Sequence, residues 1–479
     1  MAFPRLGGAP VGDAASVALT VTLADHVVTV ANTALDDQDT EAARILLLDN
    51  FIVSLWGASR PWTQEIAAWT RRYAGTGASP VLGGHWCTEP SVAALVHGTA
   101  AHSYELDDTH DETLSHPGSA IIAAALAVGA DIGATQADLL RALVAGYEAM
   151  ALLGSSAGGM ETVHRGFHPT SVFGSFGAAT ACVCLDAYRR GAQVSRQDLI
   201  GAWGHALSQA CGAMQFSVEP DGGEVKRVHA GFGARNGVLA AAFAGMPSVT
   251  APLRVAEGQY GLAALFGGPL RHVIPAPRLQ IHNISFKPYA CCRLFHSTID
   301  ALREATDGFS VPPSAIERIT ISGPQLIADQ HMLGQPQSTM AAQYSCPFIV
   351  GATLAYGPER YDVYGQDHLR DPRILDIASK VRFELSEELT RTYYPQHFAT
   401  GVTLKLVDGG ERSCVVVDSK GTPAHPLTRD DILAKGSGLC VGDGAPWADR
   451  LQADIWDAGQ GAAALALAVA RLSTQVASR

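Results

Sequence analysis

The sequence lacks the features expected of a secreted or membrane-bound protein. Its nine cysteines are odd in number and include no Cys-x-x-Cys pair, which argues against a disulfide framework and a zinc ribbon. No uninterrupted apolar run reaches the roughly 18 residues that a membrane-spanning helix needs. The opening residues, Met-Ala-Phe-Pro-Arg-Leu-Gly-Gly, show no basic region followed by a long apolar core, as a secretory signal would. We therefore expect a cytoplasmic protein that does not bind a membrane.

Positive charge is also scarce. The 479 residues include 34 lysines and arginines against 46 aspartates and glutamates, which gives a formal net charge of -12. Because a nucleic-acid-binding protein needs a basic face for the phosphates, nucleic acid is not expected as a partner. A small anionic substrate is compatible with this charge, since a few local lysines can form a positive pocket.

Sequence motifs for metal and phosphate chemistry are missing as well. The chain has neither His-Glu-x-x-His nor a calcium-loop pattern. The segment Gly174-Ser-Phe-Gly177 follows no strand pattern and lacks the lysine of a phosphate-binding P-loop. We expect no bound metal, although acids and histidines crowd together between residues 102 and 112. A metal-dependent hydrolase therefore stays open as an alternative.

The first part of the chain has the periodicity of a helical domain. Apolar residues recur at helical spacing over 39–57. Thr135 and Ser195 are each followed three residues later by an aspartate, a pattern typical of helix N-termini. With 47% hydrophobic residues, the chain can bury a large core. We predict a mainly α protein with a large all-helical domain that begins with residues 1–280.

Beyond about residue 280, short strand patterns replace the helical ones. Four segments have the pattern of short strands, and an Asp-Gly-Gly turn joins the last two into a predicted hairpin: 316–322, 381–385, 402–406 and 414–417. Helical periodicity resumes after about Thr428. We therefore predict a smaller α+β domain over 281–430, inserted as a lid, and a return of the chain to the helical domain over 431–479.

The stretch from Tyr104 to Ser119 carries five acids and two histidines. It lies between two apolar helical segments, 90–102 and 120–129, where water is scarce. Charges held there must be paired or must act on a ligand. The alternative is a solvated acidic loop whose side chains cap the second helix.

Three further stretches bring polar side chains into apolar surroundings. His168 precedes a proline at a predicted helix start, where backbone N–H groups favour an anion, but alone it is better explained as a buried histidine in a capping loop. Lys226 lies in the basic run 225–237, and Lys287 lies where helical patterns give way to strands. Lone lysines are usually solvated, whereas a lysine at a domain junction suits the binding of a carboxylate.

Together these four stretches resemble the MmgE/PrpD family, which includes 2-methylcitrate dehydratase, cis-aconitate decarboxylase and iminodisuccinate epimerase. The resemblance covers nearly the whole chain and is carried by Glu105–His110 with His116–Ser119, Gly166–Thr170, Lys226–Gly231 and Lys287–Cys292. It implies a large helical domain, a smaller α+β lid, a homodimer, and no metal or organic cofactor.

The resemblance also implies an active site between the two domains. The catalytic residues would be His116, His168 and Lys226. The residues that bind the substrate would be Lys287, Thr109 and Glu105. One of these departs from the family, which usually has Asp-Phe-Asp-Asp-Thr where this chain has Glu105-Leu-Asp-Asp-Thr. The longer side chain of Glu105 predicts a substrate that differs from that of an aspartate-bearing relative.

The residue types agree with chemistry beside a carboxylate. A metal-free enzyme for di- or tricarboxylic acids must fix the carboxylates, offset charge on a developing enolate and move a proton near neutral pH. Two lysines and two histidines suit these tasks. We expect a cofactor-independent lyase for a small di- or tricarboxylic acid, foremost a 2-methylcitrate-type dehydratase. A cis-aconitate-type decarboxylase and an iminodisuccinate-type epimerase are the alternatives, and a non-catalytic carboxylate-binding protein is a more remote one.

Overall fold

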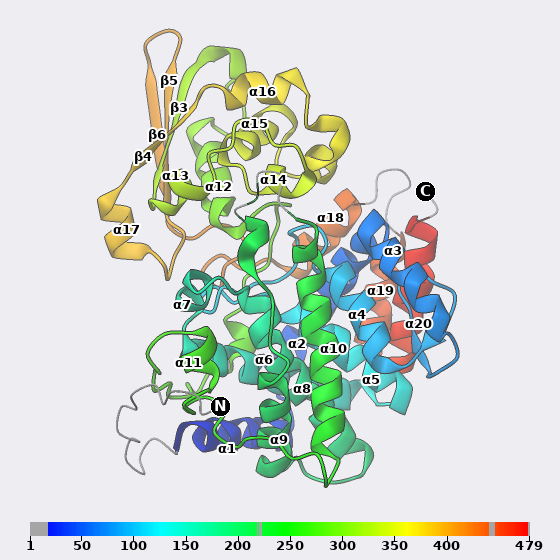
Figure 1. Cartoon of the computed structure of the whole chain (residues 1–479). Helices are drawn as coiled ribbons and strands as arrows, with labels where there is room; N and C mark the ends of the chain where they lie inside the picture. The colour runs from blue at the N-terminus through cyan, green and yellow to red at the C-terminus, as the bar shows by residue number, and fades with distance from the viewer. Residues whose placement is uncertain (1–17, 218, 220–222, 440–445, 478–479) are drawn as a thin grey trace, which may run out of the picture.

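The structure is a computed structural model that describes residues 18–217, 219, 223–439 and 446–477. Helices dominate, and a four-stranded sheet belongs to a smaller second region (Figure 1). The prediction of a mainly α protein with a smaller α+β domain is therefore confirmed. The exact domain boundaries at 280 and 430 stay a prediction.

The helical body contains eleven helices and one short β-ribbon among the described residues up to 280. The helices are α1 (Ala18–Asn32), α2 (Asp37–Ala58), α3 (Pro61–Thr70), α4 (Pro90–Ala101), α5 (Pro117–Ile132), α6 (Gln136–Ala157), α7 (Gly159–His164), α8 (Pro169–Arg189), α9 (Arg196–Leu207), α10 (Val225–Ala244) and α11 (Leu262–Phe266), and the ribbon pairs β1 (Ser79–Pro80) with β2 (Cys87–Thr88). The predicted caps are confirmed, because the Thr135 and Ser195 side chains accept the backbone N–H groups of Asp138 and Asp198.

Helix α8 is the centre of the body, where it packs against α5, α6, α9 and α10. By length and mean hydropathy it could cross a membrane, although no uninterrupted apolar run that long was found in the sequence. However, 94% of its apolar window is buried inside the protein, which is typical of a core helix. Glycine is needed where α8 crosses α6, because a Cβ atom on Gly177 would lie 2.8 Å from the carbonyl oxygen of Gly146.

The α+β domain is built on a sheet with the strand order β4-β3-β5-β6. The strands are β3 (Ile316–Gly323), β4 (Val381–Leu385), β5 (Thr400–Leu406) and β6 (Glu411–Val416); the helices are α12 (His296–Ala305), α13 (Leu326–Gln330), α14 (Thr339–Gln343), α15 (Cys346–Tyr356), α16 (Pro372–Ala378) and α17 (Glu387–Tyr393). Strand β3 pairs parallel to β4 and antiparallel to β5, and β5 and β6 form the predicted hairpin. Helix α12 packs on β5 and β6.

The last helices return to the helical body. They are α18 (Arg429–Leu439), α19 (Pro446–Trp456) and α20 (Ala462–Ala477). All three pack against α2, and α20 also contacts α5. The helical body is thus formed from both ends of the chain, and Figure 1 shows the α+β domain stacked on one end of it.

Candidate active site

The stretch between α4 and α5, which we call the acidic loop (residues 102–116), is buried. Glu105 and Asp107 are each 1% exposed and Asp108 is 5% exposed. The alternative of a solvated acidic loop is therefore wrong. The loop is held against the segment that enters the α+β domain, because Thr109 and Ser285 exchange backbone hydrogen bonds of 2.8 and 2.7 Å.

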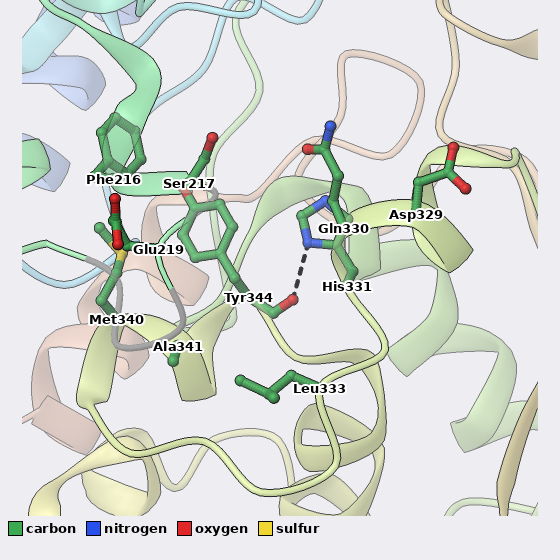
Figure 2. Close-up of a pocket in the computed structure, with 10 residues that line it drawn as sticks. All are labelled: Phe216, Ser217, Glu219, Asp329, Gln330, His331, Leu333, Met340, Ala341 and Tyr344. Carbon is green, nitrogen blue, oxygen red and sulfur yellow. Dashed lines mark hydrogen bonds between the residues drawn. The ribbon is translucent and has the colours of Figure 1, made fainter.

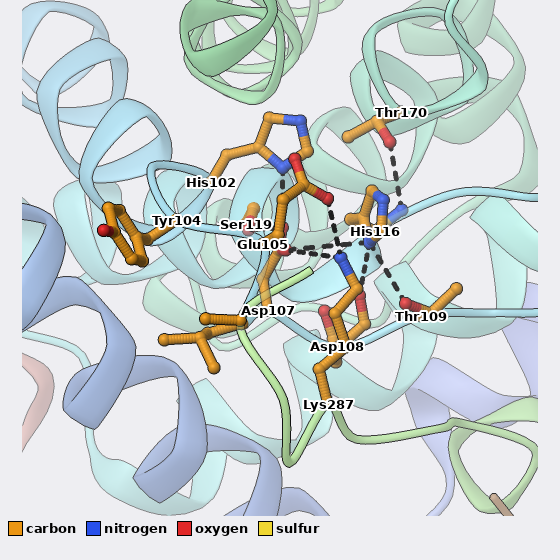
Figure 3. A network of polar contacts seen from close by, with 12 residues as sticks. His102, Tyr104, Glu105, Asp107, Asp108, Thr109, His116, Ser119, Thr170 and Lys287 are labelled. Carbon is orange, nitrogen blue, oxygen red and sulfur yellow. Dashed lines mark hydrogen bonds and ion pairs between the residues drawn. The ribbon is translucent and has the colours of Figure 1, made fainter. Parts of the chain in front are cut away.

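Glu105 is surrounded by cations from distant parts of the chain, of which Figure 3 shows Lys287. One carboxylate oxygen contacts the Lys226 ammonium and lies 3.0 Å from Nη1 of Arg227. The other accepts a hydrogen bond of 3.1 Å from Nζ of Lys287. Burial alone would raise the pKa of Glu105, but these positive charges hold it well below its usual value. Glu105 is therefore ionised and neutralises part of the positive charge of the site.

Glu105 also has an unusual backbone. Its φ angle is 55°, in the left-handed region that residues with a Cβ atom rarely adopt. This conformation costs on the order of 1–2 kcal/mol, so the surrounding structure must hold it in place.

The two neighbouring aspartates have different partners. Asp107 accepts hydrogen bonds of 2.6 Å from Nδ1 of His102 and 2.7 Å from the Ser119 hydroxyl. Asp108 accepts from the Tyr147 hydroxyl at 2.7 Å and from the backbone N–H of Gly118 at 2.9 Å. Because no cation among the residues that the structure describes pairs with Asp108, burial raises its pKa to about 7.

His116, the last residue of the acidic loop, is fixed in one tautomer. Nδ1 of His116 lies 2.8 Å from the carbonyl oxygen of Asp108, which can only accept, so Nδ1 carries the proton. Nε2 of the neutral ring is then unprotonated. Burial lowers the pKa of His116 to about 3, so the ring is neutral in the empty site. His116 can therefore act first as a base or as a hydrogen-bond acceptor.

Four histidines lie together beside this loop. Ring centroids of His102 are 5.1 Å from His116 and 5.5 Å from His168, and those of His168 and His229 are 5.2 Å apart. His168 is the N-cap residue of α8, and its Nδ1 lies 3.1 Å from Nδ1 of His229. Burial lowers the pKa of His102 to about 4 and that of His229 to about 3. The cluster is uncharged until an anion enters.

Sequence reasoning missed His102 and His229. A signal for His229 was present, because it follows Lys226 by three positions and so lies on the same face of α10. His102 stands at the C-terminus of α4, three residues before Glu105. His229 lies within the Lys226–Gly231 motif that carried the resemblance to the family but was given no role there, whereas His102 lies outside all four motifs.

One cavity, of about 580 Å³, opens between the helical body and the α+β domain. Five of the six predicted site residues line it: Glu105, Thr109, His116, His168 and Lys287. Lys226 is fully buried behind Glu105 and does not reach the wall. Apolar side chains also line the cavity, among them Met160, Leu326 and Phe398.

A smaller hollow of about 270 Å³ adjoins this cavity. The two share Ser217, Gln330, His331 and Tyr344, and Figure 2 shows His331 hydrogen-bonded to the carbonyl oxygen of Tyr344 between them. Within the described part of the chain, the smaller hollow is lined by no lysine or arginine, whereas the larger cavity is lined by Lys287 and Arg293 and is therefore the better carboxylate site.

The charges around the cavity favour an anionic ligand. Lys287 and Arg293 line the cavity, and Lys226 and Arg227 contact Glu105 at its wall. Their buried or half-buried counter-charges are Glu105, Asp107 and Asp111. Burial lowers the pKa of Lys226, whereas Lys287 keeps a raised pKa because Glu105 and Asp107 outweigh its burial. No group of three metal-ligating side chains is arranged to hold a metal ion within the described residues.

A buried set of lysines, histidines and carboxylates around one cavity is the arrangement expected of an enzyme that uses acid–base chemistry. Comparison with known proteins identifies its family. Residues 21–272 match the MmgE/PrpD N-terminal domain and residues 289–452 match the MmgE/PrpD C-terminal domain. The chain belongs to the MmgE/PrpD family and is a lyase, as the sequence motifs predicted.

Its curated relatives include several decarboxylases. The cis-aconitate decarboxylase-like protein oryM of Aspergillus oryzae is 29% identical over 423 residues, which cover 82% of this chain and 85% of the relative. The cis-aconitate decarboxylase of Aspergillus terreus is 27% identical over 378 residues, covering 73% and 74% of the two chains. The human cis-aconitate decarboxylase is 24% identical over 364 residues, covering 72% of each.

Proposed function

We propose that this protein is a cofactor-independent lyase that removes a carboxyl group from a cis-aconitate-like di- or tricarboxylic acid. The observation that carries the proposal is the cavity in which Lys287 and Glu105 meet His116 and His168. The names of the relatives support decarboxylation ahead of the dehydration that the sequence favoured.

In the proposed reaction, Lys287 anchors one substrate carboxylate. The bond to a second, departing carboxyl group breaks, and its electron pair moves through the adjacent double bond to the carbon beside the anchored carboxylate. A histidine then donates a proton to that carbon, and carbon dioxide leaves. Positive charge near the anchored carboxylate stabilises the enolate-like intermediate.

The proton source follows from electrostatics. The histidines are neutral in the empty site because burial lowers the pKa of both His116 and His168. A substrate that brings two or three negative charges raises these pKa values, since nearby opposite charge favours the imidazolium form. Substrate binding is therefore expected to take up a proton, and the same histidine becomes the general acid.

Dehydration of a 2-methylcitrate-like acid is the second candidate. It is favoured by the tautomer of His116, whose unprotonated Nε2 suits the removal of a proton beside a carboxylate. Epimerisation would use the same step. Further parts of the proposal are that the enzyme is cytoplasmic, forms a homodimer and needs no metal; light scattering tests the dimer.

The test is incubation of the purified protein with a panel of di- and tricarboxylic acids in deuterated water, followed by proton NMR. Decarboxylation predicts a product that has lost carbon dioxide and carries deuterium at one new position. Elimination of water without loss of carbon dioxide would replace the proposal by the dehydratase. Absence of any turnover or exchange, in a preparation that is folded by circular dichroism, would contradict both. The His168→Ala variant, purified in parallel, controls for contaminating activity.

A further inference from the structure

The residues on both sides of the strained residue Glu105 have their backbone carbonyl groups held by distant side chains: one carbonyl lies in the peptide group that enters Glu105, and the other lies one peptide group beyond it. The Glu105 side chain is fixed by the cations described above, but a left-handed φ of 55° must be stabilised by the backbone as well. The carbonyl groups on either side belong to Tyr104 and Leu106. Each of them accepts a hydrogen bond from a buried side chain that lies more than two hundred residues further along the chain.

Gln343, at the end of α14 in the α+β domain, holds the first carbonyl. Its Nε2 donates to the carbonyl oxygens of Tyr104 at 3.0 Å and Ala290 at 2.8 Å. Its Oε1 accepts a hydrogen bond of 2.6 Å from Nη2 of Arg227. The same arginine donates to the Glu105 carboxylate through Nη1. Gln343 is fully buried, so one side chain of the α+β domain fixes both the backbone before Glu105 and a cation on its carboxylate.

Lys435, in α18, holds the second carbonyl. Its Nζ donates to the carbonyl oxygen of Leu106 at 2.7 Å and to Oδ1 of Asp49 at 2.8 Å. Lys435 is 4% exposed, and Asp49 in α2 is 1% exposed. The lysine does not line the cavity. Its contact with Leu106 is therefore directed at the backbone of the acidic loop and not at a substrate.

We propose that Gln343 and Lys435 are positioning residues that clamp the carbonyl groups of the residues on either side of Glu105, so that its carboxylate bridges Lys226 and Lys287. The α+β domain and the C-terminal return each supply one half of this clamp. The expected effect on turnover rests on the function proposed above, whereas the expected change in the conformation of Glu105 does not.

The first experiment is structural and needs no substrate. Replacing Lys435 alone would leave Asp49 buried and unpaired, so the clamp is removed with the double variant Asp49→Leu/Lys435→Met, since well-packed apolar residues can replace a buried ion pair without loss of stability. A crystal structure of this variant is expected to show Glu105 outside the left-handed region, with its carboxylate moved from Lys287. An unchanged Glu105 would overturn the proposal, even if no substrate is ever found.

The second experiment is kinetic and uses the best acid of the panel. Asp49→Leu/Lys435→Met and Gln343→Glu are each expected to lower turnover at least about tenfold, because a misplacement of about 1 Å costs up to about a hundredfold. Asp49→Asn keeps the lysine and its bond to Leu106, and is expected to retain most activity. Equal losses in Asp49→Asn and in the double variant would overturn the role of Lys435.

A double-mutant cycle separates positioning from general structural damage. In a Glu105→Gln background, losing the clamp should cost little further activity, because the carboxylate that it positions is already gone. Fully additive losses would overturn the proposal. Gln366→Met, at an exposed position of the α+β domain, is the matched control and should behave as the unmodified protein.

Discussion

The contact between Glu105 and Lys287 can be tested by shortening one side chain. Glu105→Asp keeps the charge and withdraws the carboxylate by about 1 Å. The separation between Nζ of Lys287 and the nearer carboxylate oxygen is 3.1 Å. At an effective dielectric constant of about 20, the Coulomb attraction would fall from about 5.4 to about 4 kcal/mol. The loss of about 1.3 kcal/mol corresponds to a fall of about one unit in the pKa of Lys287.

This change should appear in the pH dependence of kcat/KM, which reports the free enzyme. Lys287 binds a carboxylate while it is protonated, below its pKa. Because Glu105 raises that pKa, the aspartate variant should lose activity at a lower pH, with the alkaline limb displaced by about one pH unit. The ranking of substrates across the graded acid panel should also change, since the carboxylate at the cavity wall has moved.

Glu112→Asp is the matched control for this prediction. Glu112 is an exposed glutamate of the same acidic loop and does not line the cavity. Its variant should keep the pH profile and the substrate ranking of the unmodified protein. A well-folded Glu105→Asp variant that also kept both would refute the reasoning, and would show that Glu105 does not set the charge or the shape of the cavity.

Four other outcomes can be measured independently. His168→Ala and Lys226→Ala should each lower turnover by about a hundredfold or more without changing the circular dichroism spectrum, because each removes an acid–base group or a charge stabiliser; wild-type rates would refute these roles. Lys287→Ala should raise the Michaelis constant more than it lowers turnover, and the reverse pattern would contradict a carboxylate anchor. The pKa of Asp108 is about 7 in the folded protein, so between about pH 4 and 7 the native state binds more protons than the unfolded chain does. Stability therefore declines as the pH rises through this range. Asp108→Asn removes the titrating group and should make the fall in melting temperature smaller. Identical declines would refute this. Exhaustive chelation should leave turnover unchanged, whereas a loss restored by one added metal would contradict metal independence.

The features predicted well from the sequence depend on neighbours in the chain. The caps at Thr135 and Ser195 are hydrogen bonds across three residues, and the β5–β6 hairpin is set by its Asp-Gly-Gly turn. Boundaries were less accurate: β6 begins at Glu411, three residues before the predicted segment. The local pattern left the burial of the acidic loop open, because two apolar flanking helices are compatible both with a buried loop and with a solvated one, and the structure decides for burial.

The pairing of the buried charges could not be predicted in the same way. Glu105 meets Lys226 and Lys287 across 121 and 182 residues of chain. No local pattern encodes such contacts, which depend on how α4, α10 and the junction segment pack. For this reason the sequence indicated that Glu105 is special, but not that it neutralises two lysines. The roles of Gln343 and Lys435 have no sequence signal, because both act through backbone carbonyl groups.

The ion pair between Asp49 and Lys435 has a consequence for synthesis of the chain on the ribosome. Asp49 lies in the second helix, and its counter-charge follows 386 residues later. An unpaired buried carboxylate is costly, so α2 cannot reach its final packing while the C-terminal return is still inside the ribosome. We expect the first helices to emerge early but to complete the body only after release. A chain that stops before residue 435 should therefore be a substrate for chaperones and proteases, however much of the N-terminal domain it contains.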